Sequence, residues 1–263
     1  MGRLDEAEKM YRQAQELAGE DCDYPFVLGD IIRRIGTLYV RRGRYEEALA
    51  LFGQALRYFE TAEHSRGYGE VLTSKGTAFY LLNQHRRAAE CYADAIFYLD
   101  PGVDSISYAA TVQNLAVVTL EMGSLDTLSF LHGKLRALLK SSKIPKIFRE
   151  RLRWIMGSAE IRFGYDVAAV RSLRKVMQRI GDRLAPHERA TLRVDLAQAL
   201  YLGGDLPGCL DELELARATL ESIDGIHPDA VEAVASCIAR VKAAEEEPWA
   251  LQSTLRRLAA AGK

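Results

Sequence analysis

A short turn signal that recurs every 40 or 41 residues constrains this chain more than any other feature. The signal stands at Gly2-Arg3, Gly43-Arg44, Asn83-Gln84, Gly123-Ser124, Gly164-Tyr165 and Gly204-Asp205. Similarity at a fixed period indicates tandem units, each of which buries its apolar face against the next one. We therefore expect a repeat array.

Residue size follows the same period. Seven residues before the turns stand small residues: Gly36, Gly76, Ala116, Gly157 and Ala197. Five residues after the turns stand small or compact ones: Ala7, Ala48, Ala88, Leu128, Ala169 and Cys209. Nine residues after them stand Tyr11, Phe52, Tyr92, His132, Leu173 and Leu213. Small residues let two antiparallel helices approach closely, and a bulky neighbour fills the space beside them. Each unit is thus predicted to be helix, tight turn, helix.

The units divide the chain into expected helix pairs. We expect a half repeat over 1–22, helix pairs over 24–63, 65–100, 104–141, 146–183 and 186–223, and capping helices over 228–263. A Ser-Ser and Ile-Pro loop within 136–148 interrupts the pattern, so the third and fourth pairs are expected to join less rigidly or with a change of superhelical direction. We expect one continuous domain over 1–263. The unpaired half repeat indicates a fragment, a late start codon, or a partner that completes the unit.

Two stretches carry a family resemblance. Ile35-Gly36-Thr37-Leu38-Tyr39 followed by Ala48-Leu49-Ala50-Leu51-Phe52 resembles the tetratricopeptide pattern, and Lys75-Gly76-Thr77-Ala78-Phe79 with Ala88–Tyr92 repeats it. The resemblance weakens from residue 110 onward, where Thr119, His132 and Glu160 replace apolar or aromatic residues. The period of about 40 residues exceeds the family's usual length of about 34 residues. In this respect the chain resembles the long-helix tetratricopeptide proteins found in signalling adaptors and bacterial regulators. HEAT repeats share the longer period but fit the signature less well.

The resemblance implies an all-α fold: a right-handed α-solenoid of antiparallel helix pairs, the tetratricopeptide superhelix. It also implies a scaffold that binds proteins or peptides in its concave groove. The segments Arg151–Gly164 and Ala190–Ala197 further resemble the repeat region of bacterial helix-turn-helix regulators. The function predicted is a non-catalytic sensing or assembly module. The rival hypothesis is a structural subunit of a larger complex that completes the N-terminal half repeat.

Composition excludes several other classes. Lys plus Arg is 35 against 36 Asp plus Glu, so the net charge of −1 argues against a chain held wholly on nucleic acid or an anionic membrane. No apolar run approaches the roughly 18 residues needed to span a bilayer. The four cysteines are scattered, which argues against a disulfide framework or a metal site and favours a reduced cytoplasm. We expect no metal, no cofactor and a cytoplasmic location.

Catalytic motifs are missing from the sequence. It has no G-x-x-x-x-G-K-[ST] phosphate loop, no G-x-G-x-x-G, no H-E-x-x-H and no G-x-S-x-G. The five histidines lie far apart. We therefore expect no catalytic residue, and an enzyme is the weakest of the three hypotheses.

The first helix of each pair is expected to line the inner groove. The partner-binding residues predicted there are Arg33, Arg34, Thr37, Thr73, Thr77, Tyr80, Gln113, Asn114, Val117, Arg151, Trp154, Ser158, Gln198 and Tyr201. Thr, Gln and Asn side chains can bond the backbone of an extended peptide. Tyr80, Trp154 and Tyr201 offer flat apolar anchors.

Asn114 is the sharpest of these candidates. The resemblance implies that an asparagine at this place holds a peptide main chain. The alternative is that Asn114 bonds a neighbouring helix, and the sequence leaves both open. The clamp of two lysines and two asparagines that captures a C-terminal carboxylate in some family members is not reproduced, so a receptor for chaperone tails is not expected.

Charge is unevenly distributed along the chain. Residues 132–183, called here the basic band, hold 14 Lys or Arg against 4 Asp or Glu, a net charge of +10. The flanking segments 1–131 and 184–263 carry −6 and −5. The band could face an acidic partner or nucleic acid, or it could be a solvated outer face. Without interleaved aromatic residues, nucleic acid is not the expected partner.

Overall fold

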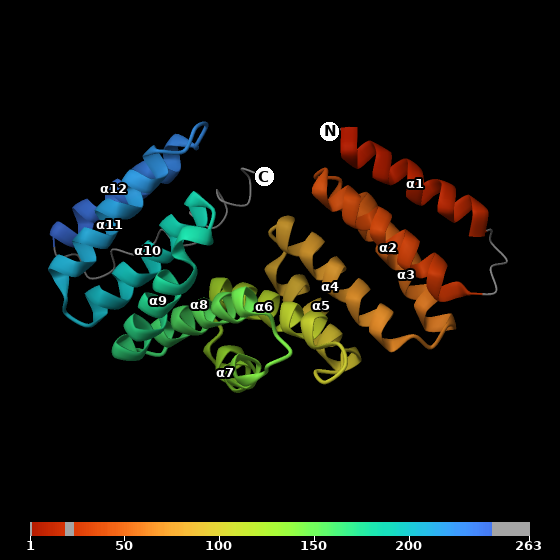
Figure 1. Cartoon of the computed structure of the whole chain (residues 1–263), viewed down its shortest axis with the longest axis horizontal. Coiled ribbons are helices and arrows are strands. Elements are labelled where there is room, and N and C mark those ends of the chain that lie inside the picture. Colours follow the sequence, from red (N-terminus) through yellow and green to blue (C-terminus); the bar gives the residue numbers. More distant parts are fainter. Residues whose placement is uncertain (1, 19–23, 244–263) are drawn as a thin grey trace. The chain divides into compact units, whose positions relative to one another are not determined.

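The computed structural model describes residues 2–18 and 24–243 of the chain, and the helices in these ranges are labelled in Figure 1. The described residues form α-helices joined by short turns and contain no strand. They divide into two compact units, Met1–Ser124 and Leu125–Lys263. The all-α class of stacked helix pairs that the period predicts is confirmed.

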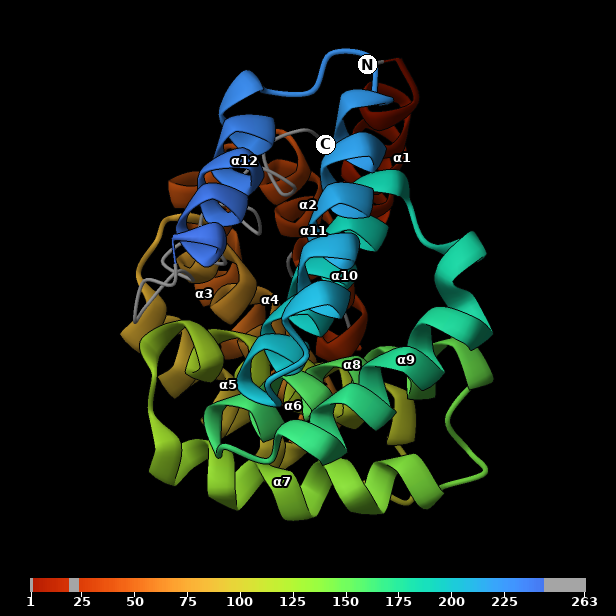
Figure 2. The same cartoon turned by 90° about the vertical axis from the view of Figure 1, so that its left-hand side faces the viewer.

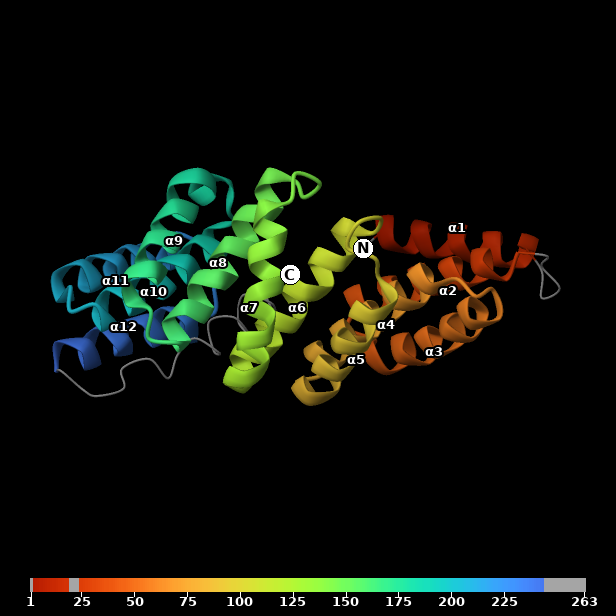
Figure 3. The same ribbon diagram turned by 90° about the horizontal axis from the view of Figure 1, so that it is seen from below.

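Unit 1 consists of an unpaired helix, two helix pairs and a further helix. The bounds are α1 Gly2–Ala18, α2 Pro25–Arg41, α3 Tyr45–Thr61, α4 Ser65–Leu81, α5 His85–Tyr98 and α6 Ser105–Met122. Helices α2 and α3 pack together, as do α4 and α5, and α1 lies against α2 (Figures 1 and 3). Helix α1 occupies most of the half repeat expected over 1–22, of which residues 1 and 19–22 lie outside the described ranges.

Unit 2 continues the alternation of helices and turns. Its bounds are α7 Leu125–Lys140, α8 Lys146–Arg162, α9 Asp166–Ile180, the 3-10 turn Gly181–Arg183, α10 Pro186–Leu202, α11 Leu206–Glu221 and α12 Pro228–Lys242. Helix α10 packs against α11, and α11 against α12 (Figure 2). The last amphipathic helix expected near 249–261 lies outside the described residues.

The periodic turn signal has a backbone cause. Gly43, Asn83, Gly123, Gly164 and Gly204 all have positive φ, between 60° and 80°. Glycine adopts this left-handed conformation without steric cost, and asparagine tolerates it better than most residues. The following residue then donates its N–H to a carbonyl five positions back, as in Arg44 to Tyr39 and Asp205 to Leu200, both at 2.9 Å. This bond closes the end of the first helix and turns the chain into the second.

The small residues before the turns mark the places where paired helices touch. A Cβ atom on Gly76 would lie 2.7 Å from Tyr92, and one on Gly157 would lie 2.8 Å from Leu173. These distances are too short for a real Cβ contact, so the helices approach through the glycine backbone. The close approach predicted from the alternation of residue size is confirmed.

Three residues depart from the family pattern: Thr119 on α6 of unit 1, and His132 on α7 and Glu160 on α8 of unit 2. Thr119 is buried and satisfies its hydroxyl by donating to the Leu115 carbonyl at 2.6 Å. His132 is half-buried, with its ring edge-on to Phe163 at 6.3 Å. Glu160 is buried, and burial raises the pKa of its carboxyl above the ordinary value.

Candidate peptide-binding surface

The predicted groove residues fall into two sets, one in each unit. Unit 1 carries on α2, α4 and α6 the residues Arg33, Arg34, Thr37, Thr73, Thr77, Tyr80, Gln113, Asn114 and Val117. Unit 2 carries on α8 and α10 the residues Arg151, Trp154, Ser158, Gln198 and Tyr201. Those on α2, α4, α8 and α10 are on the first helices of packed pairs, whereas α6 packs against α5 and α4.

Several of the unit 1 side chains bridge neighbouring first helices. The Tyr80 hydroxyl donates to Oε1 of Glu121 at 2.8 Å, so α4 is tied to α6. The Thr73 and Thr111 hydroxyls share a hydrogen bond of 2.8 Å between the same helices. These bonds hold the first helices in register along the stack.

Unit 2 contains an equivalent bridge with a buried acid at its centre. Asp195 on α10 is fully buried, and its Oδ2 accepts hydrogen bonds from Nε1 of Trp154 at 2.7 Å and Oγ of Ser158 at 2.8 Å. Nearby, Nη1 of Arg151 lies 2.9 Å from Oε1 of Glu188. Burial acts to raise the pKa of Glu188, but the bonds from Arg151 outweigh it and lower that pKa.

The acids in these bridges were missed by sequence reasoning, although a signal for them existed. Tyr80 and Glu121 are 41 residues apart, as are Trp154 and Asp195, and Ser158 and Asp195 are 37 apart. Each spacing is close to one repeat period. A search of the sequence for a donor and an acceptor about one period apart on first helices would therefore have predicted these bridges.

The threonines of unit 1 use their protons within their own helices. Thr37 donates to the Arg33 carbonyl at 2.9 Å, and Thr77 donates to the Thr73 carbonyl at 3.1 Å. Thr77 also accepts a hydrogen bond from the Tyr92 hydroxyl at 3.1 Å. Toward a ligand, the hydroxyl oxygens of Thr37 and Thr77 can therefore act only as hydrogen-bond acceptors.

Two adjacent amides on α6 are different. Within the described residues, Oε1 of Gln113 is buried without a hydrogen-bond partner. Asn114 is half-buried, and the part of the chain that the structure describes supplies no hydrogen bond to its side chain. Buried polar atoms are nearly always paired, so the unpaired Oε1 of Gln113 points to a missing partner. The role of Asn114 in holding a peptide main chain stays a prediction.

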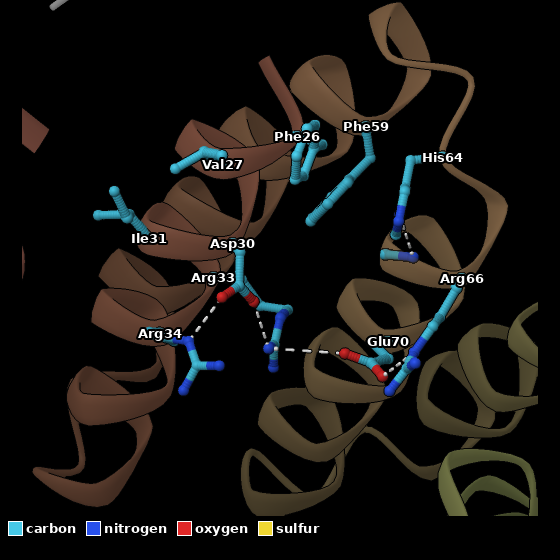
Figure 4. A pocket seen from close by; sticks show the side chains of 11 residues that line it. Phe26, Val27, Asp30, Ile31, Arg33, Arg34, Phe59, His64, Arg66 and Glu70 are labelled. Carbon is cyan, nitrogen blue, oxygen red and sulfur yellow. Dashed lines mark hydrogen bonds and ion pairs between the residues drawn. The ribbon is translucent and has the colours of Figure 1, made fainter. Parts of the chain in front are cut away.

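A pocket of about 360 Å³ opens between the first turns of α2 and α4. Figure 4 shows one side lined by the rings of Phe26, Phe59 and His64, and the other side lined by charged side chains. The charged residues are Asp30, Arg33, Arg34, Arg66 and Glu70. Sequence reasoning found Arg33 and Arg34 but missed the rest, because only the fold brings the α3–α4 turn beside α2.

The charged side of the pocket is a chain of ion pairs. Asp30 lies 2.5 Å from Nη2 of Arg33 and 2.7 Å from Nε of Arg34. Arg33 lies between the carboxylates of Asp30 and Glu70, reaching the latter at 3.5 Å (Figure 4). Burial acts to raise the pKa of Asp30, but the hydrogen bonds from the two arginines outweigh it, so that pKa is lowered. Asp30 therefore stays ionised at neutral pH.

The basic band lies on α7, α8 and α9 of unit 2. Its exposed cations include Arg136 and Lys140 on α7, which packs against α8, and Arg171, Arg174 and Lys175 on α9, the second helix of the α8–α9 pair. Second helices form the outer side of a stack in which first helices line the groove. This placement favours the solvated outer face over a groove-lining role.

The described residues contain no group of three or more His, Cys, Asp or Glu side chains that could hold a metal ion. None of the described helices is both long enough and apolar enough to cross a membrane.

Comparison with known proteins places the chain among helical repeats. Residues 27–96 match the tetratricopeptide repeat family model. These residues are tetratricopeptide repeats. Repeats of this family build protein-interaction scaffolds, whose stacked units form extended binding surfaces. No curated protein matches the chain as a relative.

Solved structures resemble most of the chain in fold. BtubC (BKLC) from P. vanneervenii is 14% identical, with 86% of this chain and 92% of that chain covered and a TM-score of 0.65. A tetratricopeptide repeat protein from Parabacteroides merdae is 14% identical, with coverage of 98% and 87% and a TM-score of 0.61. MamA from Desulfovibrio magneticus is 17% identical, with coverage of 75% and 97% and a TM-score of 0.55. At these identities the likeness concerns the fold alone.

Proposed function

We propose that this chain is a non-catalytic scaffold that binds an extended peptide segment along the first helices of unit 1. The observation that carries the proposal is the pair of amides on α6. Gln113 has a buried acceptor without a partner, and the Asn114 side chain makes no hydrogen bond within the described residues. A peptide main chain supplies both a donor and an acceptor to such amides.

The context of this binding is proposed from sequence. The resemblance of Arg151–Gly164 and Ala190–Ala197 to the repeats of bacterial helix-turn-helix regulators supports a sensing or assembly role in a bacterial cytoplasm. The free thiols of Cys91, Cys209 and Cys237 fit a reducing compartment. The partner expected is a protein segment, with no cofactor and no membrane.

A peptide selection tests the proposal. Peptides of twelve residues are selected from a random library on the whole chain, and their affinities are measured by fluorescence polarisation. Asn114→Ala should weaken binding roughly tenfold or more, because one lost buried hydrogen bond costs about 1–3 kcal/mol. Tyr80→Phe, which removes only the hydroxyl that bonds Glu121, should leave the aromatic anchor and most of the affinity intact.

Two controls separate the groove from the rest of the surface. Gln54→Ala changes an exposed amide on α3, a second helix, and should not affect binding. A triple reversal of Lys140, Lys143 and Lys146 to Glu changes the basic band. If the lysine reversal abolished binding while Asn114→Ala left it unchanged, the partner would bind the basic band and the groove assignment would be wrong.

A second candidate function follows from the incomplete burial of α1. In complete helix pairs the residues five, nine and twelve after the turn are buried, as Ala48, Phe52 and Ala55 are in α3, all fully inaccessible. The corresponding residues of α1 are Ala7, Tyr11 and Ala14, and all three are only half-buried. This supports the hypothesis that α1 packs against a helix supplied from elsewhere, as in a structural subunit.

The two candidates predict different behaviour in solution. A reversible peptide binder is expected to be a monomer in size-exclusion chromatography with light scattering. A structural subunit is expected to self-associate or aggregate, and Met10→Lys, which places a charge at a position of α1 that is 68% exposed, should restore the monomer. A monomeric wild type that is unaffected by this substitution would contradict the structural role.

A further inference from the structure

The pocket between α2 and α4 offers a ligand two chemically different sides. We propose that it selects peptide segments in which an apolar side chain is followed, about three residues later, by Asp or Glu. This inference rests on the proposed peptide-binding function and adds the class of peptide that is bound.

The apolar side of the pocket is aromatic and partly open. The Phe26 ring stacks on the His64 ring with centroids 5.8 Å apart and planes 15° apart, and the His64 ring lies 5.5 Å from that of Phe59. Nδ1 of His64 accepts the Gly67 N–H at 2.9 Å, which fixes the ring at the start of α4. Phe26 remains 42% exposed, so an apolar side chain resting on it would remove further apolar surface from water.

On the charged side, both oxygens of Asp30 and Oε1 of Glu70 accept hydrogen bonds from the protein, and Oε2 of Glu70 lies 3.5 Å from Nη2 of Arg33. Asp30 accepts hydrogen bonds from both Arg33 and Arg34. Oε1 of Glu70 accepts from Nε of Arg66 at 3.1 Å and from the Ser107 hydroxyl at 3.0 Å. A lysine or arginine of a ligand would therefore compete with donors that the protein itself supplies.

The donors on the same side are in excess. Nε of Arg33 is buried and has no hydrogen-bond partner among the described residues. Arg34 pairs with Asp30 through Nε and also bonds Tyr11, and Arg66 pairs through Nε with Glu70 and with Asp104. Their side chains remain 48% and 57% exposed, so further N–H donors are open to a ligand. Each guanidinium carries five N–H donors in a planar fork that matches a carboxylate. With acceptors occupied and donors left over, this side of the pocket favours a carboxylate.

The distance between the two sides sets the spacing in the ligand. Phe26 and Arg33 are seven positions apart on α2, which places them on one helix face about 10 Å apart along the axis. An extended peptide advances about 3.3 Å per residue. The apolar residue and the acidic residue are therefore expected about three positions apart.

A peptide library with designed positions tests this specificity on the whole chain. Four sets of immobilised peptides with random flanks are compared: Leu or Phe followed three residues later by Asp or Glu, the same peptides with Asn or Gln, the same with Lys or Arg, and the acidic set with Ser at the apolar position. The first set should be retained at least tenfold better than each of the others.

Two variants connect the preference to the pocket. Arg66→Gln should reduce the preference for the acidic over the amide set and leave the apolar preference intact. Phe26→Ala should do the reverse. Arg86→Gln and Phe97→Ala, which change side chains 87% and 86% exposed on α5, are the matched controls and should keep both preferences. Circular dichroism checks that each variant is folded.

The outcomes separate this proposal from the one on which it rests. Equal retention of the acidic and amide sets, a preference for basic peptides, or an acidic preference that survives Arg66→Gln would overturn the pocket assignment. If the chain bound peptides in a manner that depended on Asn114 but showed no such preference, the proposed function would stand and this inference would fall. If no peptide were retained, both would fall.

Discussion

A Cβ atom on Gly36 would lie 2.7 Å from Cε1 of Phe52, so α2 and α3 meet through a glycine backbone and an aromatic ring. Phe52 is fully buried, and Ala48 and Ala55 are fully buried on the same face of α3. A side chain at Gly36 would therefore have to displace a fully buried ring. This contact explains why a small residue at position 36 is matched by a large one at position 52.

Gly36→Leu is expected to destabilise the chain strongly. Overpacking of this kind costs typically about 1–3 kcal/mol, and the backbone contact allows little relaxation. The measurement is the free energy of unfolding from urea titration, followed by circular dichroism. Ala88→Phe, at a fully buried position of α5, should have a similar effect.

Gly53→Ala is the matched control. A Cβ atom on Gly53, which is within α3, would meet nothing within 4 Å. Alanine in the interior of a helix is more favourable than glycine by roughly 0.5–1 kcal/mol, so this variant should be more stable than the wild type. If Gly36→Leu left the stability unchanged, the helix–helix contact would be misplaced.

Asp195→Ala should destabilise unit 2. The substitution leaves Nε1 of Trp154 and the Ser158 hydroxyl without the acceptor they share, and an unsatisfied buried donor costs about 1–3 kcal/mol. The emission spectrum of Trp154 should change with its surroundings. Asp211→Ala, at an exposed position of α11, is the control. A loss of stability no larger than that of the control would contradict the proposed role of the buried acid.

Glu160 should make stability depend on pH. Burial raises its pKa in the folded chain, and Oε2 has no hydrogen-bond partner among the described residues. The folded chain thus holds this proton more tightly than the unfolded chain does. The free energy of unfolding should therefore fall as the pH rises from the ordinary pKa of 4.5 through the raised one.

Glu160→Gln removes this ionisation and keeps the shape of the side chain. The difference in unfolding free energy between the variant and the wild type should be constant below about pH 4 and should grow in favour of the variant at higher pH. Glu232→Gln, at an exposed position of α12, serves as the control. A difference that did not change with pH would show that Glu160 does not titrate as a buried acid.

The sequence was sufficient for those features that depend on a single repeat. The turn residues Gly43, Asn83 and Gly164 are required by a backbone with positive φ, which few residue types adopt. Gly36 and Gly76 are required by the close approach of two helices that are neighbours in the chain. Such local constraints recur in every unit, so the period exposes them.

Contacts between repeats were not visible in the same way. These contacts depend on which face of a first helix meets the next repeat. Examples are the bond between Tyr80 and Glu121 and the two bonds that Trp154 and Ser158 donate to Asp195. The pocket depends on it as well, because Phe26 and His64 come together only when the α3–α4 turn folds beside the start of α2. Residue type and spacing alone left the groove as a list of candidates, and only some of them carry unused hydrogen-bonding groups.

The most direct measurement for the central claim is photo-crosslinking of a library-selected peptide to the whole chain. A peptide with a photoreactive residue at each position in turn is bound, irradiated and mapped by mass spectrometry. The account predicts that adducts fall on α2, α4 and α6, around the pocket and Asn114, and that unlabelled peptide competes for them. Adducts concentrated on the second helices α3 and α5, or on the basic band of α7 to α9, would contradict it.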